Sequence, residues 1–119
     1  MSTNSMIARK SAKGFECIYV HWDGNLEDVG KTLIETFNSD LGAFALVALG
    51  DCSSVAGSTS IDDVTAFFRD RDEAWEDVKP LNFATLQEAI NFYGNKKFNY
   101  IWEDNGWTAY DGGGQQIDW

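Results

Sequence analysis

The sequence is poor in basic residues and contains no long hydrophobic run. Its 119 residues include nine Lys and Arg against nineteen Asp and Glu, which gives a formal net charge of -10 at pH 7. Direct binding to DNA or RNA requires a Lys- and Arg-rich surface, so we expect neither, and an anionic membrane would repel the chain. No segment approaches the roughly 18 apolar residues of a membrane span, and no signal-peptide pattern is present. These absences predict a cytoplasmic protein.

Cysteine and histidine are also scarce. The two cysteines, Cys17 and Cys52, and the single histidine, His21, are too few for a structural zinc site. In the cytoplasm both thiols are expected to be reduced, with Cys17 in a buried strand and Cys52 in a loop. The glycine-rich and serine motifs of nucleotide-binding proteins and serine hydrolases do not occur. We therefore expect no metal and no cofactor, and the sequence favours a non-enzymatic protein.

Apolar residues, by contrast, are sufficient for one core. Hydrophobic residues make up 44% of the chain and aromatic residues 14%, which excludes wholesale disorder. A domain of this size buries only about two thirds of the surface of its unfolded chain, so formation of a homodimer would supplement its core.

The pattern of the apolar residues predicts an α+β fold. Strand-like runs are found at residues 15–21, 61–68, 98–103 and 107–110. Helical spacing is found at residues 26–37, 41–49 and 86–93. The last two strands flank an Asp-Asn-Gly turn and predict a C-terminal β-hairpin. We expect a single small domain with a mostly antiparallel sheet and two to three helices.

The ends of the chain and of the helices are also marked in the sequence. Residues 1–14 are predicted to form a polar N-terminal tail or an edge strand, residues 15–111 the single domain, and residues 112–119 a Gly-rich C-terminal tail. The nearly continuous apolar run at 41–49 predicts a buried helix that ends at Gly50, and Asn38-Ser39-Asp40 can cap its start. Thr85 and Glu88 have the spacing of a capping box.

The most acidic part of the chain is the segment 61–79, which holds seven acids against three bases. A compact acidic surface can occupy a site that nucleic-acid phosphates would fill, and tryptophan is enriched at binding hot spots. If the strand at 61–68 continues, the arginines of the following charged run point to one face and the aspartates to the other. The plainer interpretation is a solvated edge strand or simple solubility. The predicted partner-binding residues are Asp62, Asp63, Asp70, Asp72, Glu73, Trp75, Glu76 and Asp77.

A second candidate site combines polar residues at three predicted element ends. A histidine near an aspartate can act as a general base, and a pair of arginines suits phosphate or carboxylate recognition. This pattern predicts a pocket for a nucleotide or another small anion, in a binding protein or a minor enzyme. The plainer interpretation is a set of turns and an ion pair. The residues of this alternative pocket are His21, Asp23, Asp51, Ser53, Arg69 and Arg71.

Residues 15–73 contain four short motifs: His21-Trp22-Asp23-Gly24, Val29-Gly30-Lys31-Thr32-Leu33, Ala48-Leu49-Gly50-Asp51-Cys52-Ser53-Ser54 and Phe68-Arg69-Asp70-Arg71-Asp72-Glu73. Together they resemble a family of small proteins from phages, prophages and mobile elements. The family has no established activity, so the resemblance carries over no catalytic residue. Small acidic phage proteins without a catalytic motif are often inhibitors of bacterial defence systems, anti-CRISPR proteins among them.

Two hypotheses of different classes follow. The first is a phage-encoded, acidic, non-enzymatic binding protein of the host cytoplasm. It would inhibit a defence complex, of the CRISPR type or another that handles nucleic acid, by occluding a basic surface through the segment 61–79. The second is the small-ligand pocket described above. A structural or assembly accessory of a phage is a third interpretation, which the sequence does not exclude.

Overall fold

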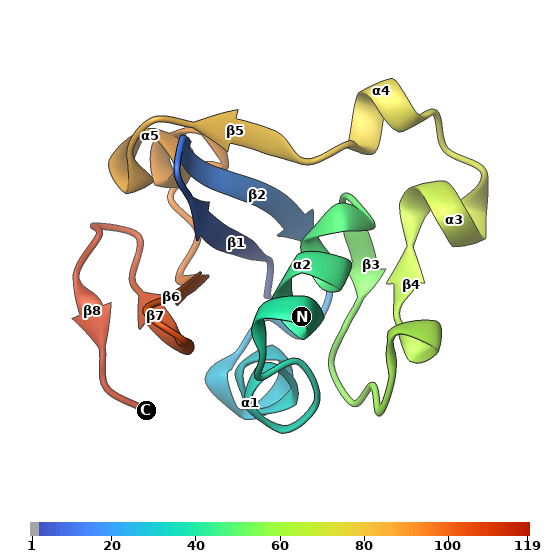
Figure 1. Ribbon diagram of the computed structural model, residues 1–119, viewed down its shortest axis with the longest axis horizontal. Coiled ribbons are helices and arrows are strands. Elements are labelled where there is room, and N and C mark those ends of the chain that lie inside the picture. Colours follow the sequence, from blue (N-terminus) through green and yellow to red (C-terminus); the bar gives the residue numbers. More distant parts are fainter. Residues whose placement is uncertain (1–2) are drawn as a thin grey trace.

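The computed structural model describes residues 3–119, and within them a mixed sheet of eight strands forms the centre of the molecule (Figure 1). The strands are β1 (Ser5–Ser11), β2 (Gly14–Val20), β3 (Cys52–Ser54), β4 (Thr65–Ala66), β5 (Leu81–Phe83), β6 (Phe98–Glu103), β7 (Gly106–Tyr110) and β8 (Gln116–Ile117). Their order is β4-β3-β2-β1-β6-β7-β8, and β5 pairs with β2 on the same side as β3. Only the β1–β6 and β2–β3 pairs are parallel. The predicted α+β fold with a mostly antiparallel sheet is confirmed.

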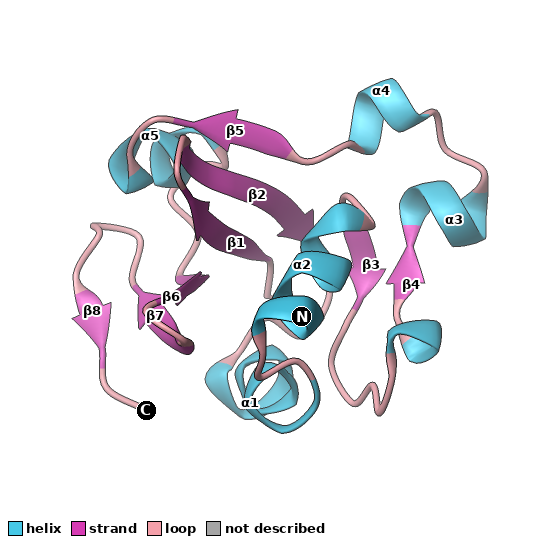
Figure 2. Cartoon of the chain, in the orientation of Figure 1, coloured by secondary structure: helices cyan, strands magenta, loops and turns pink. Residues whose placement is uncertain are grey.

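Short helices lie on both sides of this sheet (Figure 2). The α-helices of the described chain are α1 (Lys31–Thr36), α2 (Asp40–Ala48), α3 (Phe67–Arg71), α4 (Trp75–Val78) and α5 (Leu86–Phe92). A π-helical turn, Leu26–Gly30, leads into α1, and a 3-10 turn, Ile61–Asp63, precedes β4. In the part of the chain that the structure describes, no helix has both the length and the apolar character needed to cross a membrane.

The N-terminal strand lies inside the sheet. β1 pairs antiparallel with β2 and parallel with β6, so both of its edges are used. The expectation of a polar tail or an edge strand at 1–14 is therefore wrong for its described residues, while residues 1 and 2 lie outside them. Met6, Ile7 and Ala8 are all fully buried, because an interior strand covered on both faces carries consecutive apolar residues and does not alternate.

Two hydrophobic cores occupy the two faces of the sheet. The core under α1 and α2 includes Ile7, Ile18, Val20, Leu33, Leu46, Tyr100 and Trp102. The core under α5 is smaller and includes Met6, Ala8, Cys17, Ala89, Ile90 and Ile101. Neighbouring residues of one strand enter different cores, as the period of two along a strand requires.

Two of the three predicted helices begin with side-chain caps. The Ser39 hydroxyl accepts a hydrogen bond of 2.9 Å from the Gly42 N–H at the start of α2. Thr85 Oγ1 accepts one of 3.2 Å from the Glu88 N–H and donates one of 3.0 Å to Glu88 Oε1 at the start of α5. These hydrogen bonds satisfy amide donors that the helix itself cannot pair.

The helix α2 is less buried than its composition predicts. Ala43, Leu46 and Val47 are fully buried against the sheet, whereas Leu41 and Phe44 are 81% and 50% exposed. The prediction of a helix buried on all sides is therefore wrong, because the sheet covers only one face of α2 and the other face has no element over it.

The C-terminal hairpin is confirmed, with β6 and β7 in antiparallel register. Asp104 and Asn105 in its turn both have positive φ, 52° and 63°. Two consecutive residues in this conformation give the turn a twist that matches the twist of the flanking strands. The Asp-Asn-Gly sequence predicts this turn because Asp, Asn and Gly tolerate positive φ best.

The chain after the hairpin folds back onto the domain. Gln116–Ile117 pairs with β7 as an edge strand. The Trp119 ring packs on Tyr100, with ring centroids 5.5 Å apart. It also lies against Gly30, where a Cβ atom would come within 2.6 Å of Trp119 Cζ3. The predicted Gly-rich tail at 112–119 is therefore part of the folded domain.

The segment 61–68 differs most from its predicted structure. Only Thr65–Ala66 is a strand, and α3 begins directly after it. Asp70 Oδ2 accepts a hydrogen bond of 2.8 Å from the Ala66 N–H, which takes this donor out of strand pairing and stabilises the first turn of α3. Arg69 and Arg71 consequently lie on a helix, and the predicted strand-like alternation of charges is wrong. Asp72 ends the helix with a φ of 56°.

Candidate functional site

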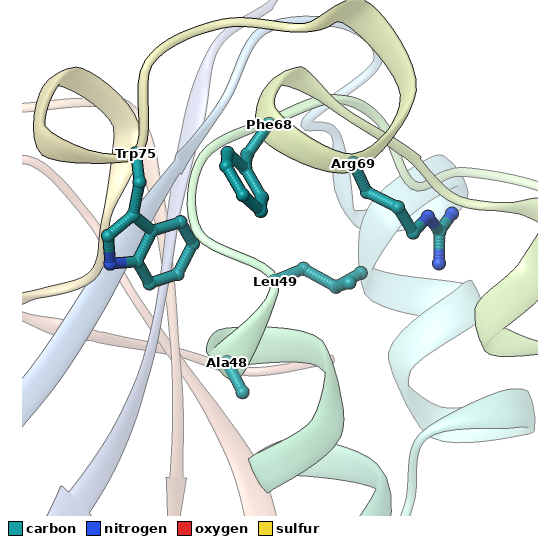
Figure 3. A pocket seen from close by; sticks show the side chains of 5 residues that line it. All are labelled: Ala48, Leu49, Phe68, Arg69 and Trp75. Carbon is teal, nitrogen blue, oxygen red and sulfur yellow. The ribbon is translucent and has the colours of Figure 1, made fainter.

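An apolar groove lies between the C-terminal end of α2 and the helices α3 and α4 (Figure 3). It is lined by Ala48 and Leu49 at the end of α2, by Phe68 and Arg69 on α3, and by Trp75 on α4. Its volume is about 520 Å³. Because four of the five lining side chains are apolar, the groove offers a hydrophobic surface that is open to water.

The two aromatic rings of the groove form an edge-to-face pair. The centroids of Phe68 and Trp75 are 5.1 Å apart and their planes make an angle of 66°. The side chains remain 47% and 38% exposed. Figure 3 shows both rings beside the space above Leu49. Large aromatic side chains that stay exposed together in a hollow mark an interaction surface.

The backbone of Asp51 holds the two aromatic walls in place. Its N–H donates a hydrogen bond of 2.7 Å to the Val78 carbonyl at the end of α4, and its carbonyl accepts one of 3.1 Å from the Phe67 N–H at the start of α3. Gly50 permits this approach, because a Cβ there would lie 2.4 Å from the Val78 carbonyl oxygen and 3.3 Å from Trp75 Cζ3. The helices that carry Phe68 and Trp75 are therefore tied to one point behind the groove.

The Asp51 carboxylate accepts a backbone hydrogen bond from β2 at a position where no neighbouring strand does so. Its Oδ1 accepts a hydrogen bond of 2.9 Å from the Tyr19 N–H, between the part of β2 that pairs with β5 and the part that pairs with β3. Burial raises the pKa of Asp51 to about 6; the Tyr19 hydrogen bond opposes this rise and the nearby Glu73 adds to it. A carboxyl with this pKa titrates below neutral pH, close to the walls of the groove.

Arg69 and Asp70 stabilise α3. Arg69 Nε donates a hydrogen bond of 3.0 Å to Asp70 Oδ1, Nη1 donates one of 3.1 Å to the Ile61 carbonyl, and Nη2 donates to the Val64 carbonyl. The hydrogen bond to Arg69 lowers the pKa of Asp70. In Figure 3 the guanidinium points away from both aromatic rings. Arg69 thus contributes its aliphatic stem to the groove, while its guanidinium is bonded to Asp70 and to two backbone carbonyls.

The predicted partner-binding acids fall into two groups. Asp62 and Asp63 lie on the 3-10 turn, and Asp63 Oδ2 accepts hydrogen bonds from the Thr59 N–H and hydroxyl at 2.9 and 2.7 Å, which lower its pKa. Asp63 and Asp70 thus form hydrogen bonds within the segment that carries β4 and α3, and Asp62 is an exposed neighbour of Asp63. The second group is exposed and lies within three residues of Trp75 in the chain. We call this group the acidic rim; it comprises Asp72, Glu73, Glu76 and Asp77.

Only Arg69 of the alternative pocket lines the groove. Arg71 lies against the Phe67 ring, with its guanidinium carbon 5.9 Å from the ring centroid. Ser53 is buried, and its carbonyl accepts a hydrogen bond of 3.0 Å from the Trp22 N–H. These placements give Arg69, Arg71 and Ser53 roles in the packing of α3 and β3.

The remaining residues of the alternative pocket lie near the end of β2. His21 Nδ1 shares a hydrogen bond of 2.7 Å with the Tyr19 hydroxyl. Asp23 has a φ of 54°, and its carbonyl accepts a hydrogen bond from the N–H of Val29, which lies in the π-helical turn. Asp51 bonds to the Tyr19 amide, as described above. Among the residues that the structure describes, no three His, Cys, Asp or Glu side chains are grouped so that they could hold a metal ion.

Both cysteines are buried and free. Cys17 lies in β2, as predicted, whereas Cys52 begins β3 and is not in a loop. Burial raises the pKa of each thiol to about 12, and the neighbouring carboxylates of Glu16 and Asp51 add to the shift. At neutral pH both are protonated and enclosed, which is the environment of an unreactive cysteine.

Two of the five groove residues, Trp75 and Arg69, were predicted as site residues, although for two different sites, and the other three were not. Ala48 and Leu49 belong to a run that we predicted to be buried, and Phe68 to a predicted strand. The turn between α3 and α4, which brings Phe68 next to Trp75, depends on the left-handed conformation of Asp72. Aspartate tolerates this conformation better than most residues, and this was the one local signal for the turn.

Comparisons of the chain with family models, with curated proteins and with solved structures found no match. The resemblance of its motifs to a phage family stays a prediction. The interpretation of the groove therefore depends on the chemistry of its own residues.

Proposed function

We propose that this chain is a non-enzymatic binding protein that docks its groove and acidic rim onto a basic surface of another protein. The observation that carries the proposal is the exposure of Phe68 and Trp75 in a groove beside four exposed carboxylates. The rings supply apolar area for binding, and the carboxylates select the charge of the partner.

The two parts of this surface make different contributions to binding. A buried aromatic anchor is typically the hot spot of an interface, and its truncation to alanine costs about 2 kcal/mol or more. Charges at the edge of an interface mainly raise the association rate and exclude partners of the same sign. With a net charge of -10, the chain would be attracted to basic surfaces and repelled by acidic ones.

The partner class that we propose is a protein that handles nucleic acid. Such proteins present Lys and Arg where they contact phosphates, and a cluster of carboxylates on a folded domain competes for the same positions. A bacterial defence complex of the CRISPR type is the specific partner suggested by the phage resemblance, with inhibition by occlusion as the mechanism.

Binding is favoured over catalysis by the chemistry around the groove. Its one charged lining residue, Arg69, is engaged by Asp70 and by two backbone carbonyls. The remaining lining residues are Ala48, Leu49, Phe68 and Trp75, none of which acts as a nucleophile, acid or base. The two thiols of the chain are buried, with raised pKa values.

The proposal is tested by capture from a bacterial lysate with a charge-reversed variant. The variant carries Glu73→Lys, Glu76→Lys and Asp77→Lys; the control carries Glu27→Lys, Glu35→Lys and Asp118→Lys, three exposed acids outside the acidic rim. Asp70 is left unchanged because it stabilises α3. Capture is carried out at about 100 and 500 mM salt, between which the Debye length falls from about 10 Å to less than half of that.

We expect the wild type and the control to retain the same nucleic-acid-handling protein at low salt, and the rim variant to lose it. The wild-type chain should also displace DNA or RNA from the captured protein. Equal capture by the rim variant, or capture that is unchanged at high salt, would contradict the proposal.

A further inference from the structure

Exposed side chains of α2 extend the groove into a longer apolar surface. Leu41, Phe44 and Ala48 follow one another at the i, i+3 and i+7 spacing, so they lie on one face of the helix. All three are exposed, and Ala48 also lines the groove. At 1.5 Å per residue the row is about 10 Å long. We call the combined surface the apolar track; it comprises Leu41, Phe44, Ala48, Leu49, Phe68 and Trp75.

The apolar track concentrates hydrophobic residues that the rest of the surface keeps apart. Eight large hydrophobic side chains are exposed in the described chain, and four of them, Leu41, Phe44, Phe68 and Trp75, belong to this one track. Scattered exposed hydrophobic residues need no explanation, but a continuous row marks a binding surface. The proposed binding surface therefore includes the exposed face of α2 as well as the groove.

The charges beside the track leave a surplus of negative charge. Arg9 lies 4.8 Å from the centroid of the Phe44 ring and is paired with Glu16 at 3.0 Å. Lys79 and Arg69 are paired with Glu76 and Asp70. Each of these three cations is thus matched by a carboxylate. The other members of the acidic rim, Asp72, Glu73 and Asp77, outnumber the remaining cation of α3, Arg71, and supply the surplus. An occupant of the track must be apolar on one side and positively charged beside it.

An extended peptide fits the molecule less well than a helix. Binding by strand addition requires a free sheet edge with several main-chain groups in a row. The outermost strands, β4 and β8, have two residues each, and β5 has three. A helix, by contrast, can lie along the exposed face of α2 at the usual distance of about 8–10 Å between packed helices. Its residues at i, i+3, i+4 and i+7 would then contact the track.

We infer that the apolar track binds a basic amphipathic helix of the partner protein. The apolar face of this helix lies on α2 and ends with one side chain in the groove, packed against the paired rings of Phe68 and Trp75. Its Lys and Arg residues lie opposite the acidic rim. This inference rests on the proposed function and specifies the segment of the partner that is recognised.

The test uses synthetic peptides of defined chemistry as the probe. A peptide of about 15 residues contains only Leu and Lys, with the leucines at the i, i+3, i+4 and i+7 spacing of one helical face. A second peptide has the same composition in an order without helical spacing, and a third has Glu in place of Lys. Affinity is measured by titration calorimetry, and the gain of helix in the peptide by circular dichroism.

Each variant of the track has a matched control elsewhere on the surface. Trp75→Ala is compared with Trp22→Ala, and Phe44→Ala with Phe92→Ala; all four side chains are exposed, so the loss of any one leaves the cores intact. We expect Trp75→Ala to weaken binding of the first peptide about thirtyfold, as for a hot-spot residue, and Phe44→Ala about fivefold. The two controls should change the affinity less than about twofold.

The other peptides separate this inference from the proposed function. Equal affinity for the peptide without helical spacing would overturn the inference and would leave binding of a basic surface in place. Equal affinity for the Glu peptide, or full affinity in Phe44→Ala, would also overturn it. Failure of the proposed function is recognised separately, by unchanged capture from the lysate with the charge-reversed rim.

Discussion

Two aromatic pairs in this protein have almost the same geometry and opposite surroundings. Trp102 and Trp107 on the hairpin pack edge to face, with centroids 5.4 Å apart and an angle of 67°. Phe68 and Trp75 do so at 5.1 Å and 66°. The first pair is 7% and 6% exposed, whereas the second is 47% and 38% exposed. The geometry of an aromatic pair therefore does not distinguish a core contact from a surface that is open to a partner, whereas its exposure does.

The polar atoms of the rings show the same difference. Trp102 Nε1 donates a hydrogen bond of 2.6 Å to Asp40 Oδ1, and Trp107 Nε1 donates one of 3.1 Å to the Phe37 carbonyl. The hairpin pair is thus closed by the fold, because its rings are covered and its N–H groups have partners. The pair at the groove leaves 47% of the Phe68 surface and 38% of the Trp75 surface open to another molecule.

Alanine substitutions in the two aromatic pairs should differ most in their effect on the free energy of unfolding. We expect Trp107→Ala to lower the free energy of unfolding by about 3–5 kcal/mol, because it leaves a cavity in the main core and removes the hydrogen bond from Nε1 to the Phe37 carbonyl. Trp75→Ala should cost less than about 1 kcal/mol, as is usual for a partly exposed side chain. Denaturant unfolding followed by far-UV circular dichroism measures both. Similar losses in the two variants would show that the groove pair is structural.

A smaller effect concerns Asp51 behind the groove, whose titration makes the free energy of unfolding depend on pH. The pKa of Asp51 is about 6 in the folded protein and near 3.9 in an unfolded chain. The folded state therefore holds this proton more tightly, and the resulting stabilisation, present below pH 4, is lost as the pH rises through 6. After allowance for solvent screening, we expect this contribution to be about 1–2 kcal/mol.

The substitution Asp51→Asn isolates this contribution, because the amide oxygen of Asn can still accept the Tyr19 hydrogen bond. The stability of the wild type relative to the variant should rise between pH 7 and pH 4. Unfolding curves of both proteins across this range measure the difference, and the other carboxylates cancel in the comparison. A constant difference would mean that Asp51 titrates as an ordinary surface acid.

The smallest effect tests how α3 holds the exposed pair. Arg69→Lys keeps the charge but cannot donate to Asp70 and to two carbonyls at once. We expect a loss of about 1 kcal/mol in stability and weaker binding of the basic helical peptide, because the orientation of Phe68 depends on α3. Arg71→Lys serves as the control, since Arg71 is exposed and contacts only the face of Phe67 among the rings. Equal results for the two substitutions would contradict this role of Arg69.

The local features of the fold were predictable from the sequence. The hairpin is indicated by its turn residues, Asp104 and Asn105, and by the alternation of side chains along its two strands. All of these residues lie close together in the sequence. The caps at Ser39 and Thr85 depend on a spacing of three. These features depend only on residues that are close in sequence, which explains why the turn and the caps could be predicted.

The features that depend on distant or competing contacts were not predictable. The run at 61–68 has the composition of a strand, but only Thr65–Ala66 is one, because α3 begins at Phe67 with Asp70 bonded to the Ala66 amide. The position of β1 inside the sheet depends on β6, far away in the sequence. The acidic neighbours of Trp75 led to the prediction that it binds a partner, whereas Phe68 joins it only through the turn at Asp72.

The parallel pairing of β1 with β6 also determines the order in which the molecule can fold. Ser5 pairs with Phe98, and Arg9 with Trp102, so one edge of β1 has no partner until most of the chain has been synthesised. β1 and β2 can form a hairpin early, but closing the sheet is a slow step that joins residues far apart in the sequence. Until that step the open edge of β1 can pair with other chains. Synthesis in the cell therefore passes through a stage at which this protein is most prone to aggregate, and that stage ends when β6 leaves the ribosome.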